Sequence, residues 1–370
     1  MISDKINLFK NTFYQRIDDA QWSDWQWQLA NMIKSFSDFK RIFAISDNDA
    51  SNFAQNKRLP IGVTPFMAAV MYNGGENAVL QKLHIPHSYE NILSEGELDD
   101  PLGEENDMKT PGLVHKYPDR VLFLVTSNCG AYCRYCTRSR SVGQRHMSNR
   151  ESWQKALDYI SEHQEIRDVL VSGGDPLVLP DDDLDWILSR IRAIKHVEII
   201  RIGTRAVITM PMRITNNLLA IFKKYNPLFF SLHFSHYLEL VPEVVEACDK
   251  LADNGNVMGS QTVLLKGVND DTEVIKELMH KLLKCRVKPY YLFACDPVKG
   301  SYPFRCKIEK GLEIINSLRG HTSGYAVPTF AIDTPGGGKV VISPDNVEKK
   351  EEKYLVVKNY EGKAFKFPNY

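Results

Sequence analysis

Three cysteines stand close together in the segment CGAYCRYC at 129–136, at a C-x3-C-x2-C spacing. Cys129, Cys133 and Cys136 could hold three irons of a 4Fe-4S cluster and leave the fourth iron open to an exogenous ligand. A structural zinc site uses four closed protein ligands, and the other cysteines of the chain lie far away in sequence. A zinc knuckle or three incidental buried thiols is the alternative. The spacing therefore favours a catalytic cluster.

A second candidate site is the run DTPGGGK at 333–339. Three successive glycines allow positive φ and a close approach to a ligand. Lys339 could form the Schiff base that binds pyridoxal 5'-phosphate (PLP). The alternative is a flexible surface loop with a solvated lysine.

The cysteine spacing is the signature of radical S-adenosylmethionine (SAM) proteins, and the chain resembles the lysine 2,3-aminomutase family of radical SAM, PLP-dependent enzymes. The resemblance covers roughly Trp22 to Phe365. It rests on WSDWQWQ at 22–28, PGLVHKYPDRVLFLVTSNCGAYCRYCTRSRSVG at 111–143, VLVSGGDPL at 169–177, LRGHTSGYAVPTFAIDTPGGGK at 318–339 and ISP at 342–344. The order of these blocks along one chain makes a chance match implausible.

Short β-rich runs alternate with amphipathic helical stretches between residues 120 and 335, which predicts an α/β fold with parallel strands. The expected strands are 121–126, 169–172, 197–203, 228–234, 258–265 and 289–294, and the expected helices are 151–163, 182–194, 217–225, 242–254 and 272–284. The pattern alone also fits an open doubly wound sheet. The resemblance implies a radical SAM partial (β/α)6 barrel with an N-terminal helical extension and a short C-terminal PLP-binding segment.

The expected domain organisation has three parts. Residues 1–110 form a helical N-terminal extension, with a helical run at 65–72, residues 111–320 form the partial barrel, and residues 321–370 form the PLP-lysine loop and C-terminal segment. The charged run EKKEEK at 348–353 is expected to be a solvated turn.

The expected SAM site lies at the carboxyl ends of the strands, where α/β folds bind ligands. Ser172, Gly173, Gly174 and Asp175 end the second expected strand. A plain turn is the alternative for this segment. By resemblance, His233 and Gln261 also face SAM, and a hydrogen-bonded core position is the alternative for each.

By resemblance, Lys116 and Arg120 bind the phosphate of PLP, and an ordinary exposed lysine is the alternative for Lys116. Two positions depart from the family pattern. Lys116 stands where arginine is common, and three glycines precede Lys339 where relatives usually carry four. The glycine loop is therefore expected to be shorter or shifted in register.

The resemblance also implies the substrate contacts. Arg138 matches the arginine that binds the substrate carboxylate, although Ser139 stands where lysine-specific relatives commonly show another arginine. Asp296 and Asp333 match the acids that hold the distal ammonium of lysine. The alternatives are a phosphate or structural role for Arg138, and helix capping or core hydrogen bonding for the two acids.

The expected activity is that of an isomerase that interconverts L-lysine and L-β-lysine. Reductive cleavage of SAM would give a 5'-deoxyadenosyl radical that initiates 1,2-amino migration on PLP. A 2,3-aminomutase acting on arginine or glutamate is the alternative within this class. An iron-sulfur or PLP-binding regulatory module is the non-enzymatic alternative.

Composition limits the partners of the chain. Lys plus Arg number 46 and Asp plus Glu number 46, so no net charge attracts nucleic acid or a membrane surface. The N-terminus lacks the apolar stretch of a secretory signal, and seven cysteines without a disulfide framework fit the cytoplasm. The remaining expected partners are an electron donor such as flavodoxin or ferredoxin and a second copy of the chain in a homo-oligomer. Longer members of the family that the chain resembles carry C-terminal cysteines that help form a zinc site between subunits. No structural zinc is expected here, because the segment VKNYEGKAFKFPNY at 357–370 contains no cysteine.

Overall fold

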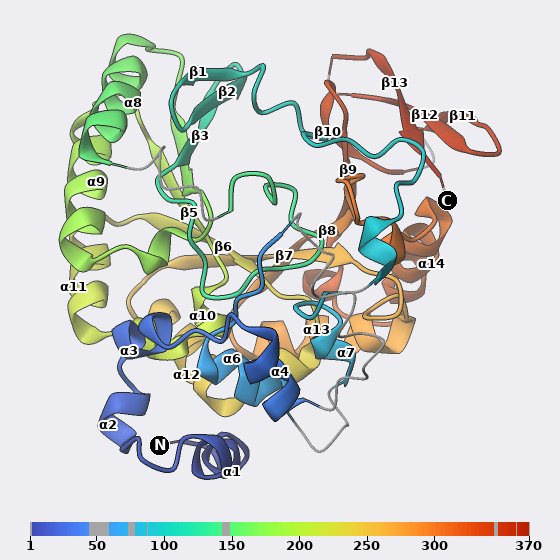
Figure 1. The fold of residues 1–370 in the computed structure, drawn as a ribbon. Helices are drawn as coiled ribbons and strands as arrows, with labels where there is room; N and C mark the ends of the chain where they lie inside the picture. Colours follow the sequence, from blue (N-terminus) through green and yellow to red (C-terminus); the bar gives the residue numbers. More distant parts are fainter. Residues whose placement is uncertain are drawn as a thin grey trace.

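The fold is built around one large sheet with helices on its outer side (Figure 1). The computed structural model describes residues 2–43, 59–72, 78–86, 88–142, 149–343, 347–359 and 361–369. Gly143 and Pro344, which end two of the segments that carry the family resemblance, lie outside these ranges. Ten strands of the described chain, β1 to β10, lie in the sheet in sequence order.

Six of these strands are parallel and form a partial (β/α)6 barrel, which confirms the expected fold class. They are β3 (Arg120–Leu124), β4 (Asp168–Ser172), β5 (Ile199–Thr204), β6 (Leu228–His233), β7 (Val257–Leu264) and β8 (Lys288–Ala294). The longer helices between them are α8 (Arg150–Glu162), α9 (Asp181–Ala193), α11 (Asn216–Lys224), α12 (Pro242–Asp253) and α13 (Thr272–Lys284). Each expected strand and helix is present within three residues of its expected bounds.

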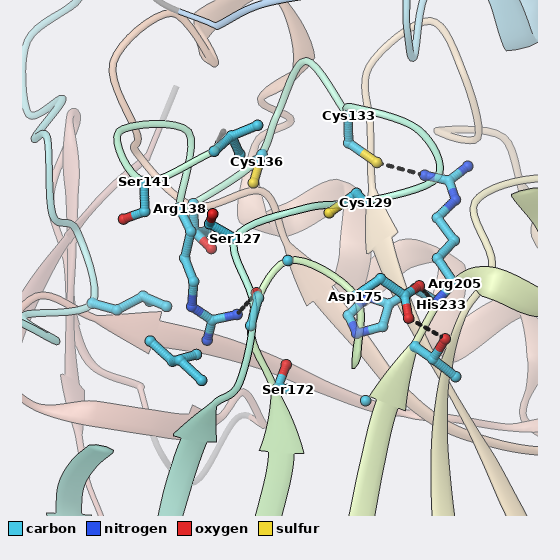
Figure 2. Close-up of a pocket in the computed structure, with 18 of the residues that line it drawn as sticks. Ser127, Cys129, Cys133, Cys136, Arg138, Ser141, Ser172, Asp175, Arg205 and His233 are labelled. Carbon is cyan, nitrogen blue, oxygen red and sulfur yellow. Dashed lines mark hydrogen bonds between the residues drawn. The ribbon is translucent and has the colours of Figure 1, made fainter. Parts of the chain in front are cut away.

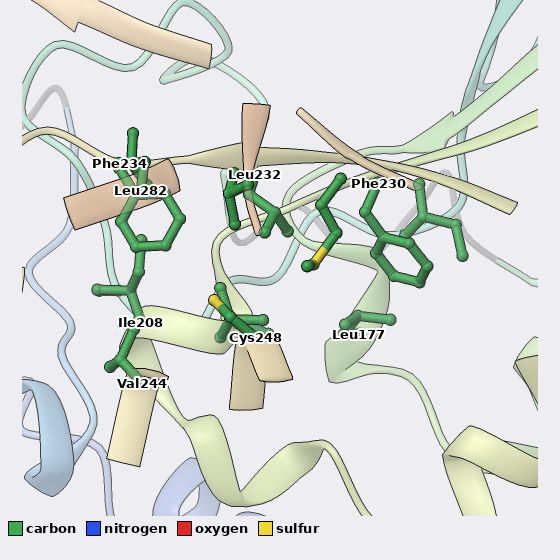
Figure 3. Packing of buried hydrophobic residues seen from close by; sticks show 14 of the residues in the cluster. Leu177, Ile208, Phe230, Leu232, Phe234, Val244, Cys248 and Leu282 are labelled. Atoms are coloured by element: carbon green, nitrogen blue, oxygen red, sulfur yellow. The ribbon is translucent and has the colours of Figure 1, made fainter. Parts of the chain in front are cut away.

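The barrel helices cover the outer face of the sheet because each has one apolar side. Leu184, Leu188 and Ile191 are buried on α9, while its first turn carries Asp181, Asp182 and Asp183. These acids complement the partial positive charge at a helix N-terminus. Figure 3 shows the result beneath β6, where Phe230 and Leu232 pack with Cys248 of α12 and other buried residues.

The sheet continues beyond the barrel at both edges. At one edge β1 (Met108–Thr110) pairs antiparallel with β2 (Leu113–Tyr117), and β2 pairs antiparallel with β3. At the other edge β9 (Thr329–Thr334) pairs parallel with β8, and β10 (Gly338–Val341) returns antiparallel to β9. The sequence analysis predicted none of these four strands. The helix α14 (Ile308–Leu318), which leads to β9, was also missed.

A small separate sheet contains β11 (Val347–Lys350), β12 (Tyr354–Lys358) and β13 (Ala364–Pro368). The expected solvated turn at 348–353 is therefore wrong at its start, because 348–350 belong to β11. β11 is an edge strand, and charged side chains are compatible with such a position. Lys350 of this strand forms an ion pair with Glu309, and Glu348 forms one with Lys358.

Short helices precede the barrel. They are α1 (Asp4–Phe13), α2 (Asp19–Trp22), α3 (Trp25–Ala30), α4 (Phe36–Ile42), α6 (Pro65–Met71) and α7 (Ala78–Gln81). α6 confirms the helical run expected at 65–72, and all seven of its residues are buried. Thr64 caps it by accepting the Met67 N–H, and Pro65 fits the first helical position. The three-part domain division remains a prediction. In the described ranges, no helix has both the length and the apolar character required to cross a bilayer.

Candidate active site

A cavity of about 750 Å³ opens at the carboxyl ends of the barrel strands. This volume lies within the ~300–1,000 Å³ typical of ligand sites. The cavity brings together most of the residues that the sequence analysis proposed. They are Cys129, Cys133, Cys136, Arg138, Ser172, Gly173, Gly174, Asp175, His233, Gln261, Asp296, Asp333 and Lys339.

The cysteine loop follows β3 and arches over the strand ends, with all three thiols on the cavity (Figure 2). Among the described residues, no group of three or more His, Cys, Asp or Glu side chains could hold a single metal ion. A 4Fe-4S cluster needs a different arrangement of ligands, since each cysteine binds a separate iron. Burial, Asp175 and the two other thiols raise the pKa of Cys129 well above its ordinary value. Iron would reverse this penalty by stabilising the thiolates.

A buried arginine that the sequence analysis missed contacts this loop. Arg205, which follows β5, donates from Nη1 to the Sγ of Cys133 at 2.8 Å and to the hydroxyl of Tyr135 at 3.1 Å. Its Nη2 forms an ion pair with the buried Glu239. This network fixes one side of the cysteine loop.

The segment Ser172 to Asp175 lies directly against the cysteine loop, and its glycines are required by that packing. Gly173 has a φ of +139°, and a Cβ placed there would lie 2.2 Å from the carbonyl oxygen of Thr126. A Cβ at Gly174 would lie 2.2 Å from the carbonyl oxygen of Asn128. Only glycine permits this approach.

Asp175 is buried and already accepts three hydrogen bonds from the protein. Its Oδ1 accepts from the Leu177 N–H at 3.0 Å and the Thr204 hydroxyl at 2.7 Å, and its Oδ2 accepts from the Arg205 N–H at 2.7 Å. Asp175 therefore holds the ends of β4 and β5 together. An additional contact with a ligand would use a remaining lone pair.

His233 and Gln261 lie opposite each other in the register of β6 and β7, and both side chains line the cavity. Burial and the cations Arg205, Arg138 and Lys339 lower the pKa of His233 to about 4. His233 is thus neutral at pH 7 and can both donate and accept hydrogen bonds.

The glycine run forms the turn of the β9–β10 hairpin. Gly336 and Gly338 adopt φ values of +74° and +77°, a region that favours glycine. The turn places Lys339 directly opposite Asp333 in the antiparallel register. The side-chain nitrogen of Lys339 lies 4.5 Å from the ring centroids of both Tyr291 and Phe293.

Electrostatics suit Lys339 to imine formation. Burial lowers the pKa of its amine below the ordinary lysine value, with Arg201 and Arg120 acting in the same direction and Asp333 opposing them. A lowered pKa increases the neutral fraction of the amine, which is the nucleophilic form.

Asp296, just after β8, and Asp333 on β9 both line this cavity. Burial and the proximity of Asp333 raise the pKa of Asp296 well above its usual range, and burial raises that of Asp333. Two such carboxyl groups create a favourable place for a cation, because a cation relieves their repulsion.

Arg138 lies in the same cavity, but it has a partner that the sequence analysis missed. Glu104 accepts hydrogen bonds from Nε of Arg138 at 3.0 Å and from Nη2 at 2.7 Å. Nη1 of Arg138 lies 3.4 Å from the carbonyl oxygen of Gly173. The guanidinium is thereby oriented between the loop before β1 and the end of β4.

The two expected phosphate-binding residues have other partners. Lys116 donates to the carbonyl oxygen of Leu102 at 2.7 Å, and Arg120 stacks on the ring of Tyr117 at 4.1 Å. In the part of the chain that the structure describes, neither is among the cavity-lining residues, whereas Arg201 is. Both residues still affect the site electrostatically. The charge of Arg120 lowers the pKa of Lys339, and the charge of Lys116 lowers the pKa of Asp333. The alternation of side chains along β5 could have identified Arg201. Its neighbours Ile200 and Ile202 are buried on one face of the strand, so Arg201 faces the other side, toward the cavity.

The site therefore presents three chemically different regions within one cavity. The thiols of the cysteine loop suit an iron-sulfur cluster. The half-buried Lys339 suits a carbonyl cofactor. Arg138 and the pair of Asp296 and Asp333 suit a molecule that carries both a carboxylate and a cation.

Comparisons with known proteins agree with this chemistry. Residues 123–279 match the Radical SAM superfamily model, and residues 315–369 match the family model described as Lysine-2,3-aminomutase. The chain is 43% identical to the L-lysine 2,3-aminomutase of Bacillus subtilis, over 98% of this chain and 77% of that protein. It is also 43% identical to the L-lysine 2,3-aminomutase of Clostridium subterminale, over 98% of this chain and 86% of that protein. A glutamate 2,3-aminomutase of Clostridioides difficile is 39% identical, over 94% of this chain and 83% of that protein.

Proposed function

Because the chain belongs to the lysine 2,3-aminomutase family of radical SAM enzymes, we propose that it is an isomerase that interconverts L-lysine and L-β-lysine. Its cofactors are a 4Fe-4S cluster, SAM and PLP. The observation that carries the choice of lysine is the pair of carboxyl groups, Asp296 and Asp333, in the cavity that also contains Arg138 and Lys339.

Charge complementarity selects the substrate. The guanidinium of Arg138 binds the carboxylate of the amino acid, and a planar guanidinium is suited to bidentate contact. Asp296 and Asp333 bind the distal ammonium, which neutralises two carboxyl groups that burial otherwise disfavours. The substrate is thus held at both ends, with its α- and β-carbons between them.

We propose a set of residues of this chain for each cofactor. Cys129, Cys133 and Cys136 ligate the cluster, and Ser172, Gly173, Gly174, Asp175, His233 and Gln261 surround SAM. Lys339 holds PLP, and Lys116 and Arg120 serve its phosphate together with Arg201, which lines the cavity. When bound, these groups supply the radical and the π system for amino migration, and the barrel excludes water from them.

The test is anaerobic turnover with SAM, PLP and a chemical reductant, with products identified by NMR. We expect L-lysine to give L-β-lysine, and we expect glutamate to be a poor substrate because its distal carboxylate would meet Asp296 and Asp333. Preferential conversion of glutamate or of an uncharged amino acid would overturn the lysine assignment. Conversion of arginine in preference to lysine would favour the alternative of a second basic substrate, which the same acids could bind.

The remaining partners follow from the chemistry. The cluster requires a one-electron donor, and a flavodoxin or ferredoxin is our proposal. Seven free thiols and an oxygen-sensitive cluster fit a reducing compartment, so we propose the cytoplasm. We also propose a homo-oligomer.

A further inference from the structure

The segment Ser94 to Glu105, here called the mouth segment, contacts both the loop after β8 and the cysteine loop. Near its start, Glu97 is almost fully buried beside Arg305, at 3.5 Å from Nη2. Glu97 also accepts hydrogen bonds from the N–H groups of Tyr302 at 2.9 Å and Gly300 at 3.2 Å. These contacts fasten the mouth segment to the loop that follows β8, which carries Asp296.

Backbone contacts strengthen the same attachment. The N–H of Leu98 donates to the carbonyl oxygen of Pro297 at 2.9 Å, and the N–H of Lys299 donates to that of Leu98 at 3.0 Å. Leu98 and Val298 thus form a short parallel bridge. The start of the mouth segment therefore follows the position of the β8 loop.

The far end of the mouth segment binds the cysteine loop through Glu104. Only 7% of the Glu104 side chain is exposed, and it takes Nε and Nη2 of Arg138 in a side-on arrangement. A guanidinium has five N–H donors. Glu104 uses one from each of Nε and Nη2, and Gly173 uses one from Nη1. With the hydrogen bonds of the described residues counted, one N–H on each terminal nitrogen is left to contact a ligand at the end of the side chain.

We propose that Glu104 is a positioning residue, which holds Arg138 side-on so that its terminal fork receives the substrate carboxylate. The inference rests on the proposed function and deepens it by assigning the residue that orients the carboxylate contact. The mouth segment also links Arg138 to the loop of Asp296, so it fixes the separation between the two anchors of the substrate.

The alternative role for Glu104 is that of a competitor. In that role its carboxylate occupies Arg138 in the free enzyme, and the substrate carboxylate displaces it. The two roles predict opposite effects of removing the Glu104 charge. A positioning residue makes substrate binding weaker when it is lost, because the guanidinium is free to rotate. A displaced competitor makes substrate binding tighter when it is lost.

The experiment compares L-lysine with 1,5-diaminopentane, which is lysine without its carboxylate. Both are titrated against the anaerobic enzyme loaded with cluster, SAM and PLP, and binding is followed by the visible absorbance of PLP. In Glu104→Gln we expect lysine affinity to fall about tenfold or more, with little change for the diamine. Glu104→Asp, which retains the charge with a shorter reach, is expected to lie between the wild type and Glu104→Gln.

Glu105→Gln is the matched control. Glu105 is the neighbouring residue, and it pairs at 2.7 Å with Arg140, which lies two residues after Arg138. Because Arg138 is held by Glu104 and not by Glu105, this variant should leave the preference for lysine over the diamine intact. Unchanged or tighter lysine binding in Glu104→Gln would overturn the positioning role, as would an equal loss for both ligands. Should Glu104→Gln lose its iron or fail to fold, Glu104→Asp decides the question. A wild-type enzyme that converts glutamate but not lysine would instead contradict the proposed function.

Discussion

Asp333 and Lys339 face each other across the β9–β10 hairpin as directly paired residues. The turn between them contains three glycines, and Thr334 closes it by donating from its hydroxyl to the carbonyl oxygen of Gly338 at 2.9 Å. The proposed PLP lysine and one proposed substrate acid are thus fixed relative to each other by backbone hydrogen bonds. The two charges also affect each other. Burial lowers the pKa of Lys339, and the nearby charge of Asp333 acts in the opposite direction.

The first prediction concerns this coupling. Removing the charge of Asp333 in Asp333→Asn should lower the pKa of Lys339 further, since burial, Arg201 and Arg120 then act with less opposition. More of the amine is neutral at a given pH. The pH profile of PLP capture should therefore move to lower pH by about one unit. Borohydride trapping at a series of pH values, followed by peptide mapping, measures this shift and locates the adduct.

Asp296→Asn provides the comparison, because Asp296 also raises the pKa of Lys339 but contributes less than Asp333. Its profile should move in the same direction by a smaller amount. Lys339→Ala should give no adduct at this position. An adduct on another lysine, or a shift of the Asp333→Asn profile to higher pH, would contradict the assignment.

The second prediction concerns the cluster. Anaerobic reconstitution should give about four irons per chain. Single replacement of Cys129, Cys133 or Cys136 by Ala should abolish reductive SAM cleavage, because one iron loses its anchoring thiolate. Cys306→Ala is the control, since Cys306 is a half-buried thiol outside the cavity lining. Full SAM cleavage in all three cluster variants would exclude a cluster at this loop.

The third prediction concerns the packing of Gly173. An alanine at this position would combine a φ of +139° with a Cβ only 2.2 Å from the Thr126 carbonyl oxygen. We expect Gly173→Ala to lower the free energy of unfolding by about 2 kcal/mol or more and to weaken SAM binding. Gly324→Ala should change neither quantity, because its Cβ would meet nothing within 4 Å. Thermal unfolding and equilibrium binding of SAM would test both variants, and wild-type behaviour of Gly173→Ala would refute the packing argument.

The barrel could be predicted from the sequence because its strands and helices have strong local patterns. The run at 169–172 is short and apolar, and the helix at 272–284 repeats buried positions at Ile275, Leu278, Met279 and Leu282. The hairpin β9–β10 was missed because β10 has only four residues and its pairing with β9 is set by the turn. The glycine run was interpreted as a binding loop, although it is also the turn that defines the register.

The candidate site divides in the same way. Cysteines within eight residues of one another and a lysine after a glycine run are visible in the sequence. Glu104 was not, because its partner Arg138 is 34 residues away and the contact depends on how the mouth segment crosses the cavity. Arg205 was missed for a similar reason, since it lies 72 residues from Cys133.

The last prediction concerns the proton held by Asp296 and Asp333. Burial and mutual repulsion raise the pKa of Asp296 well above its ordinary value, and burial also raises that of Asp333. The empty pair therefore retains a proton at a pH where ordinary carboxyl groups are ionised. An incoming ammonium favours the ionised forms, so its binding should release up to about one proton at a pH where ordinary carboxyl groups are already ionised. Affinity should rise with pH through the raised pKa of the pair and then level off.

6-Aminohexanoate is a suitable probe for this prediction, because it has the carboxylate and distal ammonium of lysine but lacks the α-amine that would react with PLP. Calorimetric titration of the PLP-loaded enzyme in buffers of different ionisation heat measures the protons released. Hexanoate, which lacks the ammonium, should release none. Asp296→Asn should weaken 6-aminohexanoate binding by a few kcal/mol at most, because one partner of a desolvated charged contact is lost, and it should reduce the proton release. Binding that is independent of pH between 5 and 8, with no proton release in the wild type, would show that the two acids do not hold the ammonium.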